Sequence, residues 1–243
     1  WNLMLADKIA YYKETGKNLM VTPAKYKKME EYSYLKEVDS LALANVQMDL
    51  QQAYSNFYNR VKKGRKAGFP KFKSRKRSRN SYSTNNQNGS VRIENGKIKL
   101  PKVGFVKIVQ HRPLMENSII KTVTIRKMPT GKYYISILVE YENQILKIIP
   151  DTFVGLDFAM HGLFVDSEGN DSGYPNFLRE TEKKLVRTSR KFSRTDKDSK
   201  NHEKLRLKLC RLHEKIANQR RDFLHKKSFA LAEKFDCIAI EDI

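Results

Sequence analysis

The stretch Phe153-Val-Gly-Leu-Asp157-Phe-Ala-Met-His-Gly-Leu-Phe-Val-Asp166-Ser-Glu-Gly169 decides the fold of the second half of the chain. Its pattern predicts two short apolar strands around a tight connection, and its last four residues predict a turn after the second strand. Asp157 lies within the first apolar run, where we expect it to be buried. A buried carboxylate is costly unless it is paired or binds a metal ion, so Asp157 is the first candidate functional residue.

A second candidate carboxylate follows a later strand. Cys237-Ile-Ala-Ile240 predicts another apolar strand, and Glu241 comes directly after it. Between the two strands, the spacing of apolar residues predicts a helix through Phe192 and a long helix from about His202 to Lys234. Two strands that each bring an acid to one end of a sheet, separated by a pair of helices, indicate a metal-dependent nuclease of the RNase H type.

The chemistry of phosphodiester hydrolysis explains why two acids are expected together. The reaction needs an activated water and a way to neutralise charge on the attacking and leaving oxygens, and two Mg²⁺ ions about 3.5–4 Å apart provide both. Hard cations prefer clustered carboxylate oxygens. We therefore predict catalytic and metal-binding roles for Asp157 and Glu241, with Asp166 and Asp242 as weaker candidates. Such sites normally use a third carboxylate, for which the sequence offers no convincing candidate.

The charge of the chain indicates a polyanionic partner. Its 243 residues contain 48 Lys and Arg against 27 Asp and Glu, a net charge of +21, which is typical of nucleic-acid-binding proteins. A membrane surface is the alternative partner, but no run of about 18 apolar residues is present. The two cysteines, Cys210 and Cys237, exclude a disulfide scaffold and favour a reducing, cytoplasmic setting.

Much of the positive charge is concentrated in one segment in which aromatic residues alternate with cations. This arrangement places stacking surfaces beside phosphate-binding groups, which favours contact with nucleic acid over a merely solvated face. The segment alone does not distinguish RNA from DNA. The candidate nucleic-acid-binding residues are Lys62, Lys63, Arg65, Lys66, Phe69, Lys71, Phe72, Lys73, Arg75, Lys76, Arg77, Arg79 and Tyr82.

The whole chain is predicted to be an α+β, multidomain protein. Residues 1–63 show helical spacing, 64–88 form the basic linker, and 89–150 contain short strands with regularly placed turns. Asn95-Gly96 between two apolar runs predicts a hairpin with a type I′ turn. We expect the strands to form a small oligonucleotide-binding barrel, with a purely structural sheet as the alternative. Residues 151–243 form the acid-bearing α/β region.

The long helix predicted near His202–Lys234 is itself strongly basic. Its cations either face a nucleic-acid groove or form a solvated surface, and both interpretations remain open at this stage. The residues concerned are Arg206, Lys208, Arg211, Lys215, Arg220, Arg221, Lys226 and Lys227.

Four motifs resemble the TnpB (OrfB) proteins of insertion sequences, which are relatives of type V CRISPR effectors. Trp1-Asn2 resembles the end of an N-terminal helix motif of that family. Gly68-Phe-Pro-Lys-Phe-Lys-Ser74, with Ser81-Tyr82, resembles its G-x-P-x-F-K-S segment. Val154-Gly-Leu-Asp157 and Ile238-Ala-Ile-Glu241-Asp242 resemble the first and second RuvC motifs. The ordered set spans essentially the whole chain.

The resemblance implies a helical recognition segment and a wedge β-barrel, followed by part of an RNase H-like RuvC domain. It implies RNA-guided, Mg²⁺-dependent cleavage of DNA at Asp157 and Glu241, with a guide RNA and double- and single-stranded DNA as partners. A nucleoid-associated protein of the prokaryotic cytoplasm is expected. The family's first strand, third RuvC Asp and Zn²⁺-binding ribbon are absent, so we expect an internal fragment that binds nucleic acid without efficient cutting. The alternatives are a nuclease-deficient RNA- and DNA-binding protein and a DNA-rearranging transposase.

Overall fold

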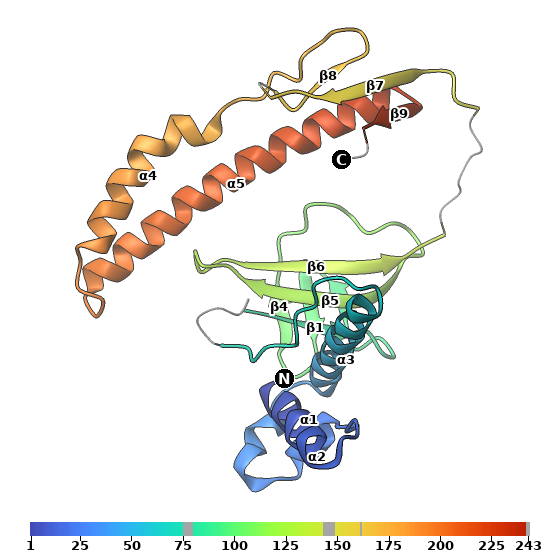
Figure 1. Cartoon of the computed structure of the whole chain (residues 1–243), viewed down its shortest axis with the longest axis vertical. Helices are drawn as coiled ribbons and strands as arrows, with labels where there is room; N and C mark the ends of the chain where they lie inside the picture. The colour runs from blue at the N-terminus through green and yellow to red at the C-terminus, as the bar shows by residue number, and fades with distance from the viewer. Residues whose placement is uncertain (75–79, 143–148, 161, 242–243) are drawn as a thin grey trace. The chain divides into compact units, whose positions relative to one another are not determined.

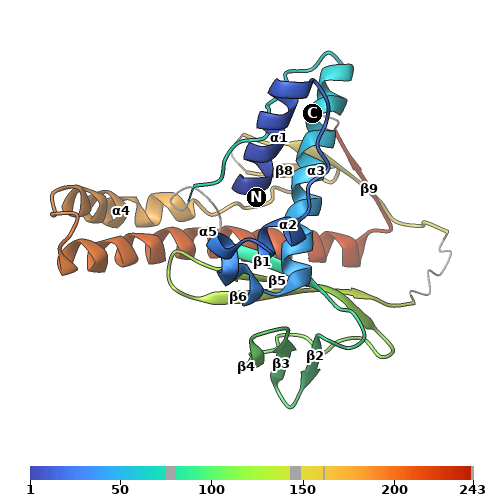
Figure 2. The ribbon, with the colours of Figure 1, turned by 90° about the horizontal axis from the view of Figure 1, so that it is seen from below.

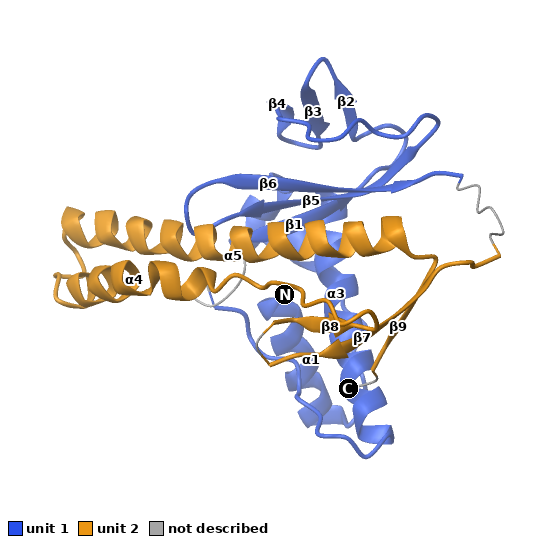
Figure 3. Cartoon of the chain, turned by 90° about the horizontal axis from the view of Figure 1, so that it is seen from above, with its two compact units in different colours: residues 1–143 blue, residues 144–243 orange. Residues whose placement is uncertain are grey.

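The computed structural model describes residues 1–74, 80–142, 149–160 and 162–241 (Figure 1). The chain divides into two compact units, Trp1–Asn143 and Gln144–Ile243 (Figure 3). The sequence predicts four segments, 1–63, 64–88, 89–150 and 151–243, whereas the structure separates only two compact units. The finer division into four segments therefore stays a prediction. In the described part of the chain, no helix is both long and apolar enough to cross a membrane.

The first unit begins with helices. They are α1 (Asn2–Thr15), α2 (Pro23–Lys27), the 3-10 helix η1 (Glu30–Lys36) and α3 (Ser40–Lys62). α1 ends at Gly16, which adopts a left-handed conformation with φ of 69° that glycine tolerates without strain. α3 begins at Asp39, whose side chain accepts a hydrogen bond from the backbone N–H of Leu41.

A compact apolar core joins these helices. Leu5 of α1 and Leu50 of α3 are almost completely buried, together with Met4 and Tyr26. The Tyr26 hydroxyl donates a hydrogen bond to Asp7 over 2.9 Å, which satisfies the one polar atom that this ring brings into the core. The helical character predicted for the N-terminal segment is therefore confirmed.

The remainder of the first unit consists of two antiparallel three-stranded sheets. The larger sheet has the order β1 (Ser81–Asn85), β5 (Ile119–Lys127), β6 (Tyr133–Glu140). The smaller sheet has the order β2 (Arg92–Glu94), β3 (Lys97–Leu100), β4 (Gly104–Lys107), and Figure 2 shows it beside the larger sheet. Asn95 and Gly96 both have positive φ, at 49° and 69°, which confirms the predicted type I′ hairpin.

The predicted closed barrel is wrong for the described residues. Closure requires each edge strand to pair with the next strand around the barrel, whereas β6 pairs only with β5, and β2 and β4 pair only with β3. The apolar faces are instead buried by packing one sheet against the other. Val123 of the larger sheet shares a single core with Val91, Ile98 and Leu100. The region is therefore a mixed α/β unit with small open sheets.

The second unit is a small sheet with a long helical hairpin. The sheet has the order β8 (Phe164–Asp166), β7 (Phe153–Phe158), β9 (Cys237–Ile240), with β8 antiparallel and β9 parallel to β7. α4 (Phe177–Ser193) and α5 (Lys200–Lys234) lie side by side between β8 and β9 in sequence (Figure 1). The strand–hairpin–helix pair–strand order predicted from the sequence is confirmed.

Candidate metal centre and nucleic-acid-binding segment

The register of β7 and β9 places the two candidate acids at the same sheet end. Phe153, Val154, Gly155 and Leu156 pair in order with Cys237, Ile238, Ala239 and Ile240. Asp157 and Glu241 are the next residues on the two strands. Neighbouring strands lie about 4.8 Å apart, and paired residues of parallel strands share a face of the sheet. The sequence therefore folds so that both carboxylates occupy adjacent positions at the ends of two parallel strands.

Asp157 is exposed, so the expected burial of this carboxylate is wrong. It lies at the open end of β7, and its neighbour Phe158 is also 63% exposed. The apolar run on either side of Asp157 suggested a buried strand, but burial depends on what packs over the sheet, which the local pattern does not specify. An exposed carboxylate needs no permanent partner and stays accessible to a cation.

Within the described residues, the side chains of Asp157 and Glu241 form no hydrogen bond or ion pair. In the same residues, no group of three or more His, Cys, Asp or Glu is assembled that could hold a metal ion. His161 and Asp242 lie outside the described residues. The two carboxylates at neighbouring positions are therefore available to an external ligand, and their predicted role as metal ligands stays a prediction.

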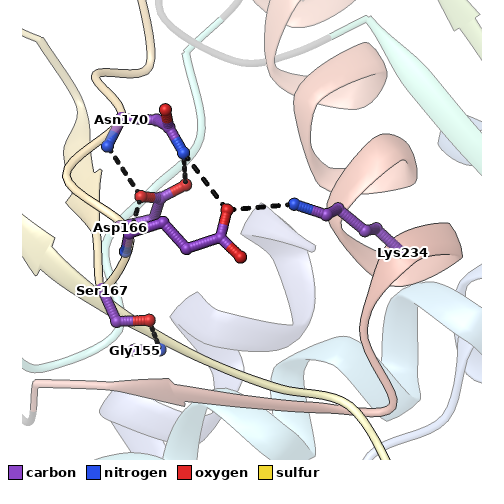
Figure 4. A network of polar contacts seen from close by, with 6 residues as sticks. Gly155, Asp166, Ser167, Asn170 and Lys234 are labelled. Carbon is purple, nitrogen blue, oxygen red and sulfur yellow. Dashed lines mark hydrogen bonds and ion pairs between the residues drawn. The ribbon is translucent and has the colours of Figure 1, made fainter.

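Asp166, by contrast, is committed to the turn that follows β8. Its Oδ1 accepts hydrogen bonds from the backbone N–H groups of Glu168 (3.0 Å) and Asn170 (2.7 Å), and its Oδ2 accepts one from Asn170 Nδ2 (3.0 Å). The side-chain and then the backbone hydrogen bonds of Asn170 lower the pKa of Asp166. Figure 4 shows this carboxylate enclosed by the turn. These contacts give it a structural role.

The same turn is linked to the sheet and to α5. Gly155 donates its backbone N–H to Ser167 Oγ over 3.2 Å, and its carbonyl accepts the N–H of Ser167 over 2.9 Å. Lys234, in the last turn of α5, pairs with Glu168 over 3.2 Å. Figure 4 shows both links. The end of the long helix is thereby held to the turn shortly before β9 begins.

Asp236 is a structural carboxylate that sequence reasoning missed. Its Oδ2 accepts the backbone N–H groups of Asp151 and Thr152 (3.1 Å each) and the Thr152 hydroxyl (2.9 Å). The N–H of Asp151, followed by the Thr152 side chain, lowers the pKa of Asp236. The Asp236 N–H in turn donates to Thr152 Oγ1 over 2.9 Å. This reciprocal contact fixes the register of β9 against β7. The one sequence signal was an Asp directly before an apolar strand.

The basic linker is held by the start of α1. Asn2 Nδ2 donates to the carbonyl of Lys73 (2.8 Å), and Asn2 Oδ1 accepts the Lys73 N–H (2.9 Å). Trp1 Nε1 donates to the carbonyl of Lys71 over 3.0 Å, and the Lys73 ammonium lies 3.9 Å from the Trp1 ring centre. The first two sequence motifs, about 70 residues apart, are therefore in direct contact.

The aromatic residues of the linker differ in their surroundings. Phe69 packs edge-on against Tyr54 and Phe57 of α3, with ring centres 5.5 and 5.4 Å away, and it remains 45% exposed. Phe72 is 57% exposed and Tyr82 is 37% exposed. Of the predicted cations, Lys62, Lys63, Arg65, Lys66, Lys71 and Lys73 are exposed. Arg75, Lys76, Arg77 and Arg79 lie outside the described residues. Nucleic-acid binding by this set stays a prediction.

Comparisons with known proteins identify a family model and several proteins that are similar to this chain. Residues 136–243 match the OrfB_IS605 family model, described as "Probable transposase". The chain is 35% identical over 218 residues to the protein named "Putative RNA-guided DNA endonuclease InsQ" of Escherichia coli (strain K12), covering 90% of this chain and 52% of that protein. It is 33% identical over 221 residues to a "Putative RNA-guided DNA endonuclease" of Streptomyces pristinaespiralis, with the same two shares, 90% and 52%.

A more distant relative extends the set. The protein named "Putative RNA-guided DNA endonuclease Rv2885c" of Mycobacterium tuberculosis (strain ATCC 25618 / H37Rv) is 27% identical over 194 residues, which are 74% of this chain and 42% of that protein. The chain spans about half the length of the curated relatives it matches. The family match covers the acid-bearing strands, and the longer alignments cover 90% of the chain. The TnpB/OrfB family that the motifs resemble is thus matched by the OrfB_IS605 family model over residues 136–243 and by these relatives over most of the chain.

Proposed function

We propose that this chain is the acid-bearing part of an RNA-guided DNA endonuclease, which hydrolyses DNA phosphodiesters at a RuvC-type site containing Asp157 and Glu241. The observation that carries the proposal is the β7–β9 register, which brings these two acids to adjacent positions at one sheet end. The names of the relatives support a guide RNA and a DNA substrate. The net charge of +21 supports two polyanionic partners.

Asp157 and Glu241 are the residues that would hold Mg²⁺. Their carboxylate oxygens suit a hard cation, and both are free of competing contacts among the described residues. When bound, Mg²⁺ lowers the pKa of a coordinated water and neutralises charge on the phosphate oxygens. The role of the chain is to keep two negative groups fixed at neighbouring strand ends. The Asp236–Thr152 contact performs the positioning, because it sets the register on which Glu241 depends.

The basic linker is the proposed guide-RNA contact. Asn2 and Trp1 hold its backbone, which leaves the exposed side chains of Lys71 and Phe72 directed to solvent rather than tied to the protein. A fixed backbone reduces the conformational entropy lost when these side chains bind phosphates and bases. The linker therefore offers a partly preorganised surface for a nucleic-acid strand.

The 243-residue chain is expected to bind nucleic acid but to cut it inefficiently. Two carboxylates supply only part of the ligand set of a two-metal site, and the described residues bring no third acid to them. Efficient cleavage is therefore a property proposed for the full-length reading frame that encodes this chain.

The test compares cleavage by the full-length protein and by its Asp157→Ala variant. Each protein is co-expressed with its flanking RNA and purified, and cleavage of DNA matched to that RNA is measured with and without Mg²⁺. Cutting that needs both RNA and Mg²⁺ and disappears in Asp157→Ala supports the proposal. Tight RNA and DNA binding without cutting by either protein would instead identify a nuclease-deficient binder, and joined DNA strands would identify a transposase.

A further inference from the structure

The β7–β8 hairpin is supported along the outer edge of β8 by residues 170–172, which follow the turn shown in Figure 4. The backbone N–H of Asp166 donates to the carbonyl of Asn170 over 3.0 Å. The backbone N–H of Ser172 donates to the carbonyl of Phe164 over 3.1 Å. Residues 170–172 therefore serve β8 as a short additional strand.

The position of Asp157 depends on this side of the sheet. The register of β7 with β9 ends at Leu156, which lies opposite Ile240. The register of β7 with β8 continues further, and it places Asp157 opposite Val165. Val165 in turn forms a bridge with Asp171. Because β8 contains only three residues, its alignment with Asp157 needs the support of residues 170–172.

Ser172 adds a buried side-chain contact to this support. The residue is 1% exposed, and its Oγ accepts the backbone N–H of Leu163 over 2.8 Å. Leu163 belongs to the connection between β7 and β8. The Ser172 hydroxyl also donates to Asp171 Oδ1 over 3.3 Å, and the same oxygen accepts the N–H of Gly173 over 2.8 Å. Since an N–H group buried without an acceptor is costly, the hydroxyl fixes the connection to residues 170–172.

Gly162 allows the connection to approach Ser172 closely. A Cβ atom at position 162 would lie 2.9 Å from Ser172 Oγ and 2.5 Å from Asp171 Oδ1. The exposed carboxylate of Asp171 can rotate away from such an atom. The buried hydroxyl of Ser172 cannot move without weakening its hydrogen bond with Leu163. A side chain at position 162 is therefore expected to displace this hydroxyl.

We propose that Ser172 is a positioning residue for the acid pair, and that its buried hydroxyl holds the β7–β8 hairpin so that Asp157 stays beside Glu241. The proposal rests on the proposed function and adds to it a residue that contacts neither metal nor substrate. Within the described residues, no side-chain contact fixes the two carboxylates, so their geometry depends on the backbone. A metal site requires its ligands to be placed within about 0.5 Å. Loss of the hydroxyl should therefore weaken the site without removing a ligand.

The test uses the full-length protein, co-expressed with its flanking RNA, as wild type, Ser172→Ala and Gly162→Ala. The matched control is Thr188→Val, which removes another buried hydroxyl of the same unit, one that donates to the carbonyl of Lys184 within α4 over 2.7 Å. Single-turnover cleavage of matched DNA is measured over a range of Mg²⁺ concentrations, and DNA affinity is measured in EDTA. Hydrogen exchange followed by mass spectrometry reports the protection of backbone amides in residues 153–166 and in α4 and α5.

The expected result for Ser172→Ala is local loosening of the hairpin together with a weaker metal site. Amides of residues 153–166 should exchange at least about tenfold faster, while those of α4 and α5 keep their wild-type rates, because local opening is confined to one part of a fold. The Mg²⁺ concentration for half-maximal cleavage should rise about tenfold, the lower end of the effect that outer partners of metal ligands have. DNA affinity should be unchanged. Gly162→Ala should change exchange and Mg²⁺ requirement in the same direction, and Thr188→Val should match the wild type in both.

The two readouts separate a positioning role from a merely structural one. Unchanged exchange in residues 153–166, or faster exchange with the wild-type Mg²⁺ requirement, would overturn the proposal. If Ser172→Ala does not fold, as judged by circular dichroism, Gly162→Ala decides by the same criteria. If Asp157→Ala abolishes cleavage while Ser172→Ala cuts like the wild type, the positioning role fails and the proposed function stands. A wild type that binds RNA and matched DNA without cutting would overturn both.

Discussion

Four carboxylates in or beside the small sheet of the second unit form two pairs with opposite surroundings. Asp166 and Asp236 use their oxygens to accept backbone and side-chain hydrogen bonds within 2.7–3.1 Å. Asp157 and Glu241, at the ends of β7 and β9, accept none within the described residues. All four belong to or directly flank the same small sheet. The fold therefore uses two acids to assemble the sheet and leaves two acids free, and the free pair is the one suited to bind an external ligand.

This difference separates stability from activity. A satisfied carboxylate stabilises the fold, because its removal leaves N–H donors without an acceptor. A free carboxylate contributes little to the folded state, and holding two of them side by side has a small repulsive cost. Removing a carboxylate of the hydrogen-bonded pair should therefore lower the stability of the fold. Removing a carboxylate of the free pair should leave stability unchanged and reduce cleavage.

The largest expected effect is on cleavage by the free pair. In the full-length protein, Asp157→Ala or Glu241→Gln should lower the rate of RNA-guided DNA cleavage by roughly 10²–10³-fold or more, since metal-assisted charge neutralisation supplies several kcal/mol. Neither change should lower the urea midpoint of the 243-residue chain, because no structural contact is lost. Single-turnover cleavage and urea unfolding are the two measurements. A large loss of stability in Asp157→Ala would contradict the distinction between the pairs.

The second effect is on stability and comes from Asp236. Asp236→Ala should clearly lower the urea midpoint of the second unit, because the N–H groups of Asp151 and Thr152 lose their acceptor. Asp157→Ala is the matched control, since it removes the same group from the neighbouring strand, at the opposite end of the sheet. Thr152→Val should also be destabilising, and the double variant should lose less than the sum of the two. If the losses of stability of the two single variants simply add in the double variant, Asp236 and Thr152 do not stabilise the fold through their mutual contact, which would contradict the prediction.

The sequence predicted the free pair better than the structural pair, for a physical reason. Strand pattern and the order of elements are local properties, so the alignment of Asp157 with Glu241 could be inferred from two apolar runs that each end in an acid. The Asp236–Thr152 contact joins residues 84 apart and depends on register, which no local pattern reports.

The errors have the same origin. The Asn95-Gly96 turn was predicted correctly because its conformation depends on two adjacent residues. The closed barrel was wrong because closure depends on pairing between distant edge strands. The expected burial of Asp157 was wrong because the exposure of a strand depends on what packs against it. Local signals thus identified the elements and their order, and long-range packing decided closure and burial.

A third, smaller effect is the dependence of stability on pH. Hydrogen bonds lower the pKa of Asp166 and of Asp236 in the folded state. The stabilisation from both groups is therefore present above the ordinary Asp pKa of about 3.9 and is lost as the pH falls through the lowered folded-state values. The urea midpoint of the wild type should decrease below about pH 4 more steeply than that of Asp166→Asn/Asp236→Asn. Parallel curves for the two proteins would contradict this assignment.

The smallest expected effect concerns the link between the turn and α5. Lys234→Gln removes an exposed ion pair with Glu168, in which both side chains are more than half exposed, so the loss of stability should be only about 0.2–1 kcal/mol. Lys226→Gln, which removes the local Lys226–Asp222 pair within α5, is the matched control. The Lys234 effect should largely disappear at about 1 M salt, where the screening length is near 3 Å. A loss that persists at high salt would mean that the Lys234 stem and its contact with the Phe235 ring, 4.6 Å away, hold the helix end rather than the charge.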